Sequence, residues 1–152
     1  MGKIIGYMIT WTTYGTWLQG DKRGYVKDGK ILGENDALLQ SNLKRLKNPP
    51  TRLDTEHCDI VRRAILKKAK DIRQQIYAIA VRPNHVHIVA ERTNETIEKV
   101  VSYYKNAARI ALRRGGFVGR VWTRGFDKRF CFDRDQLQSK IKYVQDHRNT
   151  ID

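Results

Sequence analysis

The stretch that decides the fold is RPNHVHIVA, residues 82–90, which holds two of the four histidines of the chain. Side chains of a β-strand alternate between its two faces, so a strand here places His85 and His87 on one face. Val86 and Ile88 then point the other way, into a core. The Cα atoms of the two histidines would lie about 6.5 Å apart. Because imidazole binds most catalytic divalent metals, the pair is one part of a candidate metal site.

A histidine pair does not by itself establish such a site. Paired histidines on a strand are often two half-buried polar side chains that bond to their neighbours. Two imidazoles also leave a metal site incomplete, so at least one further ligand has to come from another segment.

Composition indicates one domain of ordinary size, residues 1–152, because 40% of the residues are hydrophobic and the length allows a proper core. No stretch approaches the length of a membrane span, and the N-terminus lacks the apolar core of a signal peptide. Cys58 and Cys131 each lie in a periodic segment, far apart in the sequence. We therefore expect two reduced core thiols and a cytoplasmic protein.

The charge is strongly basic, since 30 Lys and Arg against 16 Asp and Glu give a formal net charge of +14. The excess lies in residues 41–82 and 101–152, whereas residues 83–100, around the histidines, are close to neutral. A basic excess of this size favours a polyanionic partner, and nucleic acid is the first candidate.

Hydrophobic periodicity predicts strands over 3–13, 76–81, the histidine stretch and 126–132, with irregular structure over 25–53. It predicts helices over 54–73, from an N-cap at Asn94 to Gly115-Gly116, and from Asp133 onward with Gln136 at the capping-box position. The order of these elements predicts an α+β fold, an antiparallel sheet with helices packed on one face.

The last predicted helix supplies the candidate third ligand, His147, with Tyr143 one turn before it. A free phenol has a pKa near ~10 and is a poor nucleophile at neutral pH. A divalent cation acts as a Lewis acid on a phosphoryl oxygen and favours a nearby phenolate. The three histidines together with Tyr143 therefore suit phosphodiester transesterification. The alternative is that Tyr143 is an ordinary side chain of a fraying amphipathic helix.

These residues resemble those of the HUH-superfamily nucleases. His85-Val86-His87, after Pro83-Asn84, is similar to their His-hydrophobic-His motif. Residues 143–147 resemble the catalytic helix of the single-tyrosine transposases, and the runs at 11–18 and 121–125 look like their REP-associated and related members. The resemblance implies a ferredoxin-like fold, single-stranded or hairpin DNA as substrate, and a covalent 5′-phosphotyrosine on Tyr143. It also implies a Mg²⁺ or Mn²⁺ ion on His85, His87 and His147, and a homodimer that can exchange the tyrosine helix in trans.

DNA contacts are expected from the aromatic and basic loop at 14–24 and from basic residues of the helices and the last strand. The candidates are Tyr14, Trp17, Lys22, Arg23, Lys105, Arg109, Arg124, Lys128 and Lys140. A DNA partner would make the protein nucleoid-associated.

Two other functions stay open. A non-catalytic, domesticated module that binds single strands would explain the charge and the aromatic residues, but not the spacing of Tyr143 and His147. A metal-dependent hydrolase would use water as its nucleophile and would leave no protein–DNA adduct. Tyr103 and Tyr104 are weaker candidate nucleophiles, because an alanine stands four residues after each.

Overall fold

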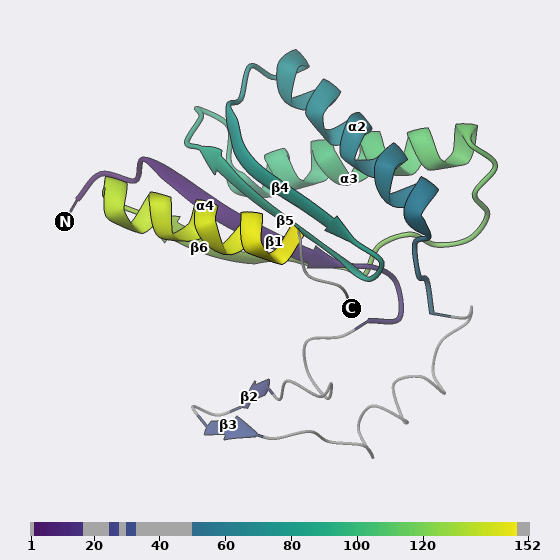
Figure 1. The fold of residues 1–152 in the computed structure, drawn as a ribbon, viewed down its shortest axis with the longest axis horizontal. Coiled ribbons are helices and arrows are strands. Elements are labelled where there is room, and N and C mark those ends of the chain that lie inside the picture. The colour runs from purple at the N-terminus through teal and green to yellow at the C-terminus, as the bar shows by residue number, and fades with distance from the viewer. Residues whose placement is uncertain (1, 17–24, 28–29, 33–49, 149–152) are drawn as a thin grey trace.

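The computed structural model describes residues 2–16, 25–27, 30–32 and 50–148. Its main sheet is antiparallel, in the order β4-β5-β1-β6. The strands are β1 (Gly6–Thr12), β4 (Ile76–Arg82), β5 (His85–Glu91) and β6 (Asp127–Cys131). The helices are α2 (Thr55–Asp71), α3 (Ile97–Arg114) and α4 (Arg134–Arg148), as Figure 1 shows. A strand–helix–strand–strand–helix–strand unit with this strand order is ferredoxin-like, so the predicted α+β class is confirmed.

The sheet separates two hydrophobic clusters. On one face, side chains such as Ile9 and Ile88 pack with α2 and α3 in the larger cluster. On the other face, Met8 and Val89 pack with α4 in the smaller cluster. The two faces alternate along each strand, as the period of two requires. Val86 and Ile88 lie in the larger cluster, which confirms the core predicted for them.

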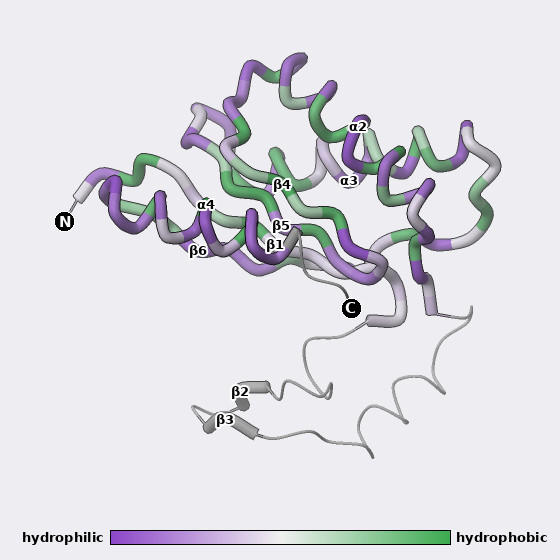
Figure 2. The backbone as a smooth tube through the Cα atoms, viewed as in Figure 1, coloured by the Kyte–Doolittle hydropathy of each residue, from purple (hydrophilic) through white to green (hydrophobic). Residues whose placement is uncertain are grey.

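The position of α4 differs from the expectation that all helices share one face. The helices α2 and α3 do share a face, whereas α4 covers the opposite one (Figure 1). The physical reason is that the strands also carry apolar side chains on this second face, such as Met8 and Val89, and the narrow apolar stripe of the largely hydrophilic α4 covers them (Figure 2). A helix on the α2–α3 face could not reach the histidines, because Val86 and Ile88 point to that face and the histidines to the other.

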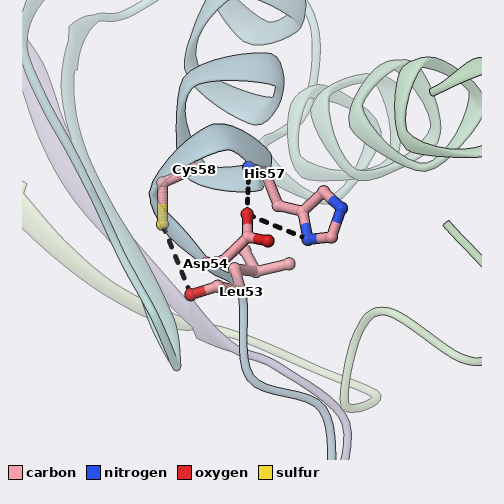
Figure 3. Close-up of polar contacts among 4 residues, drawn as sticks. All are labelled: Leu53, Asp54, His57 and Cys58. Atoms are coloured by element: carbon pink, nitrogen blue, oxygen red, sulfur yellow. Dashed lines mark hydrogen bonds and ion pairs between the residues drawn. The ribbon is translucent and has the colours of Figure 1, made fainter. Parts of the chain in front are cut away.

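The helix α2 begins where the sequence predicts. Asp54 is its N-cap, and its Oδ1 accepts a hydrogen bond from the backbone N–H of His57 at 2.7 Å (Figure 3). The same carboxylate oxygen lies 3.2 Å from Nδ1 of His57, and the thiol of Cys58 donates to the Leu53 carbonyl at 3.9 Å. Cys58 is half-buried, and burial raises the pKa of its thiol.

The start of α3 was predicted two residues too early. Thr96, not Asn94, is the N-cap, and its hydroxyl accepts from the backbone N–H of Lys99 at 3.2 Å. Thr96 has the extended backbone that an N-cap needs, immediately before the first helical residue. Gly115 ends the helix as predicted.

The capping of α4 follows the predicted pattern with one variation. The Asp133 carboxylate accepts from the backbone N–H of Gln136 at 2.8 Å. The Gln136 side chain accepts in return from the backbone N–H of Phe132 at 2.7 Å, one residue before the expected position.

The region predicted to be irregular contains a small hairpin, in which β2 (Tyr25–Lys27) pairs with β3 (Lys30–Leu32). Short strands of this length carry little periodic signal, which is why the pattern did not reveal them. Trp17, Lys22 and Arg23 lie outside the described residues. Among the described helices, none has the length and apolar character to cross a membrane.

Candidate metal and nucleophile site

The two strand histidines occupy the middle of the sheet, because β5 lies between β4 and β1. His85 is opposite Thr12 of β1, and His87 is opposite Thr10. Both side chains are buried, with 8% and 5% of their surface exposed, and their ring centroids are 4.8 Å apart. The prediction that they share one face is confirmed by the alternation of the strand, since the intervening Val86 lies in the core of the other face.

The helix α4 brings the third histidine to this pair. Val144 is fully buried against the sheet, and His147 follows it by almost one turn, half-buried. Nε2 of His147 lies 2.6 Å from Nε2 of His85, and the ring centroids of His147 and His87 are 4.6 Å apart. One ligand atom from each of the three histidines can be chosen so that all lie within 4.8 Å of one another.

This set of donors suits a divalent cation. Three imidazole nitrogens bind first-row divalent ions and leave coordination positions open for water or substrate oxygens. At 2.6 Å, the two Nε2 atoms of His85 and His147 share one proton in a hydrogen bond, because a lone pair cannot donate to another lone pair. A cation at this point would take the place of that proton.

Tyr143 lies at the open edge of the histidine cluster. Its ring stacks on that of His147, with centroids 5.8 Å apart and planes 19° apart, and it meets His87 edge-on at 5.6 Å. Half of the side chain, 50%, is exposed. The phenol is therefore adjacent to the candidate metal ligands and open to a substrate from solvent.

The rival tyrosines are placed differently. Tyr104 is fully buried in the larger hydrophobic cluster, and its hydroxyl donates to Gln74. Burial raises the pKa of the Tyr104 phenol far above the usual value. Tyr103 lies beneath the ammonium of Lys68, 5.4 Å from the ring centroid. Both belong to α3, on the face of the sheet away from the histidines.

Two polar side chains that sequence reasoning missed contact the histidines directly. Nδ1 of His85 lies 2.6 Å from Oδ1 of Asn84, and Nδ1 of His87 lies 2.7 Å from the hydroxyl of Thr10. A usable signal for Thr10 was present, because Thr10 and Thr12 alternate along a strand that is otherwise apolar. Their pairing with the histidines depends on strand register, which the pattern does not contain.

Four of the expected DNA contacts have partners within the fold, and one of them, Arg109, donates to Oδ1 of Asn106 at 3.4 Å. Tyr14 is buried and has the Arg120 guanidinium over its ring, at 4.8 Å from the centroid, which leaves no open ring face for stacking on a base. Lys105 donates to two backbone carbonyls of the loop at 123–125, at 3.0 and 2.8 Å, and burial lowers its pKa. Lys128 forms an ion pair with Glu98 at 3.3 Å.

Arg109 and the other described candidates are divided between two regions. Arg109 on α3 and Arg124 in the following loop are exposed, whereas Lys140 is half-buried on α4, the helix that carries Tyr143. The structure does not bring these residues together around the histidines as one surface.

Comparisons with known proteins identify a family and a similar fold. A family model described as "Transposase IS200 like" matches residues 45–147. A solved REP-associated tyrosine transposase bound to a REP hairpin superposes with a TM-score of 0.59 and 14% identity, covering 95% of this chain and 67% of that chain. A protein assigned as a transposase from Deinococcus radiodurans R1 gives a TM-score of 0.50 and 12% identity, over 99% of this chain and 95% of that one. At such identities the likeness shows the fold alone, and no curated protein sequence matches the chain.

Proposed function

Because the chain belongs to the family of IS200-like transposases, we propose that it cleaves and rejoins single-stranded DNA through a covalent 5′-phosphotyrosine on Tyr143. The observation that carries the proposal is the meeting of three histidines from two elements with a half-exposed tyrosine stacked on one of them. A nucleophile beside a metal-competent cluster is the arrangement that metal-assisted phosphoryl transfer needs.

The proposed reaction is a balanced exchange of ester bonds. The Tyr143 oxygen attacks the phosphorus and forms a phosphotyrosine, while the bond from phosphorus to the 3′-oxygen breaks. The phenol loses one proton, and the leaving 3′-oxygen gains one. A 3′-hydroxyl that attacks the phosphotyrosine in turn rejoins a strand and frees Tyr143, so no external energy source is consumed.

Each site residue has a role in this scheme. His85 and His87 lie on a central strand and are buried, so the sheet fixes the positions of both rings. His147 and Tyr143 sit on one helix four residues apart, so the pitch of the helix sets the position of the nucleophile relative to the third ligand. A Mg²⁺ or Mn²⁺ ion held by the three histidines would supply Lewis-acid activation of the phosphoryl oxygen.

The proposed substrate is single-stranded DNA at hairpin-forming sequences. The net charge of +14 supports a polyanionic ligand whose affinity falls with salt as counterions are released. The REP-associated transposase of similar fold was solved with a REP hairpin, and we extend that class of ligand to this chain as part of the proposal. Acting on cellular DNA would place the protein in the cytoplasm, at the nucleoid.

We also propose a homodimer. In the structure of one chain, α4 lies on its own sheet, so His147 and Tyr143 reach His85 and His87 in cis. Exchange of α4 between two copies would preserve the same site with the tyrosine supplied in trans. Mixing Tyr143→Phe with His85→Ala protein tests this directly, because activity can return in a heterodimer if the helix is shared.

The decisive experiment is adduct formation on Tyr143. The wild-type chain is incubated with labelled, hairpin-bearing single-stranded DNA and Mn²⁺, and the products are separated on a denaturing gel. We expect a covalent adduct and a free 3′-end for the wild type, and neither product for Tyr143→Phe. Tyr77→Phe, which changes another exposed tyrosine on β4, is the matched control and should form the adduct normally.

Each rival function gives a different result. Cleavage without an adduct would indicate a hydrolase with water as nucleophile. Salt-dependent DNA binding without cleavage by the wild type would indicate a non-catalytic binding module. An adduct that persists in Tyr143→Phe would assign the nucleophile to another residue.

A further inference from the structure

We propose that Asn84 and Thr10 are positioning residues of the metal site, each holding the Nδ1 atom of one strand histidine so that Nε2 presents a lone pair to the cation. This inference rests on the proposed metal chemistry. Side chains in this position orient the ligand ring and select its tautomer, and they influence metal affinity without touching the ion.

The contact of Asn84 determines the tautomer of His85. Its Oδ1 atom lies 2.6 Å from Nδ1 of His85. An amide oxygen has no proton to give, so the imidazole must be the donor. A neutral ring with its proton on Nδ1 has its lone pair on Nε2. Nε2 is the atom that faces His147, so His85 stands in the ligand form.

The same assignment identifies the proton in the bond between His85 and His147. Since Nε2 of a neutral His85 is the acceptor, the donor is the Nε2–H of His147. His147 must therefore transfer its proton to the other ring nitrogen, or lose it, before Nε2 can bind a cation. His85 needs no such change, which makes it the preorganised ligand of the pair.

Thr10 has the corresponding position for His87. It lies directly opposite His87 in the β1–β5 register, is buried, and has its hydroxyl 2.7 Å from Nδ1. The hydroxyl could act in either direction, and the proposal requires it to accept, because that places the proton on Nδ1 and leaves Nε2 free as a ligand. A side chain of equal size without the hydroxyl would leave the ring without this restraint.

Hydrogen bonds also fix the main chain of the turn that carries Asn84. The Asn84 carbonyl accepts from the backbone N–H of Thr13 at 3.0 Å, and Pro83, the residue before it, accepts from the N–H of Leu53 at 2.7 Å. Thr13 is fully buried, and its hydroxyl donates to the Thr51 carbonyl at 2.6 Å. The turn at 83–84 is thus tied to β1 and to the segment before α2. These bonds hold the main chain of the turn from which the Asn84 side chain extends.

The test compares variants that remove the polar atom with variants that keep it. Asn84→Leu removes the acceptor at similar volume, and Asn84→Asp keeps an oxygen at that place. Thr10→Val removes the hydroxyl at equal size, and Thr10→Ser keeps it. Mn²⁺ affinity of the full chain is measured by calorimetry without DNA, and imidazole nitrogen shifts are recorded by NMR without metal to read the tautomers.

We expect Asn84→Leu and Thr10→Val each to weaken Mn²⁺ binding by about 10- to 100-fold, the usual effect of losing such a partner. The Mn²⁺ affinities of Asn84→Asp and Thr10→Ser should stay near that of the wild type. A purely structural role for the two residues would not predict this dependence on one polar atom. In Asn84→Leu, the imidazole nitrogen shifts of His85 should no longer be those of a ring with its proton on Nδ1.

The outcomes separate this inference from the proposed function. Wild-type affinity and unchanged nitrogen shifts in Asn84→Leu and Thr10→Val, with binding lost in His85→Ala, would overturn the positioning roles alone. A wild-type chain that binds no Mn²⁺, or a His85→Ala variant that binds it normally, would overturn the metal site and this inference with it.

Discussion

Gly6 lies where β1, β5 and α4 approach each other closely. A Cβ atom added there would lie 2.8 Å from the main-chain oxygen of Ala90 and 3.1 Å from Cδ1 of Leu137. We predict that Gly6→Ala destabilises the fold, although Gly→Ala in a strand is usually favourable.

Two opposing terms set the magnitude. Reduced entropy of the unfolded chain should stabilise the variant by about 0.5–1 kcal/mol. The steric term is larger, because the Ala90 oxygen belongs to a backbone paired with β1 and would have to move by roughly 0.6 Å to reach ordinary contact. Overpacking of this kind costs about 1–3 kcal/mol. The net loss should be about 1 kcal/mol and at most about 2.5 kcal/mol, and each kcal/mol lowers Tm by roughly 2–4 °C for a chain of this length.

Urea unfolding followed by circular dichroism measures this loss. Gly2→Ala is the matched control, because a Cβ there would meet Phe132 Cβ at an ordinary 3.5 Å, and its stability should stay within about 0.5 kcal/mol of the wild type. Adding Leu137→Ala to Gly6→Ala should not restore stability, since the Ala90 oxygen remains. A Gly6→Ala protein as stable as the wild type, or rescue by Leu137→Ala, would refute the reasoning.

Two further predictions concern the helix α4 and the thiols. Val144→Ala and Val100→Ala each remove two buried methyl groups, on α4 and on α3, and each should cost about 2 kcal/mol in urea unfolding. Only Val144→Ala should also weaken Mn²⁺ binding in calorimetry, because α4 carries His147; equal Mn²⁺ affinities in the two variants would contradict this. Burial raises the pKa of the Cys58 and Cys131 thiols, and the thiolate is the reactive form, so both should react with a disulfide reagent at pH 8 at least about tenfold faster in urea than in the native protein. Rapid labelling of native Cys131, followed by mass spectrometry, would count against its buried position.

Local pattern determined much of the candidate site. The period of two in residues 85–89 is enough to place His85 and His87 on one face, because the alternation of a strand does not depend on its neighbours. The spacing of four between Tyr143 and His147 likewise places the two on one side of a helix. The start of α2 near Asp54 and the helix end at Gly115 were also predicted, since both depend on local sequence, although the N-cap of α3 was placed at Asn94 instead of Thr96.

Only the tertiary structure decided how these local elements are placed relative to one another. Both faces of the sheet carry apolar residues, so the pattern could not show that α4 covers the face opposite α2 and α3. That choice is what brings His147 to His85. Thr10 and His87 are 77 residues apart, and their contact exists only because β1 pairs with β5 in one particular register. A shift of that register by one residue would turn the side chain of Thr10 away from His87. The alternation of Thr10 and Thr12 marks the more polar face of β1, but residues 6–12 alone do not show which strand pairs with them.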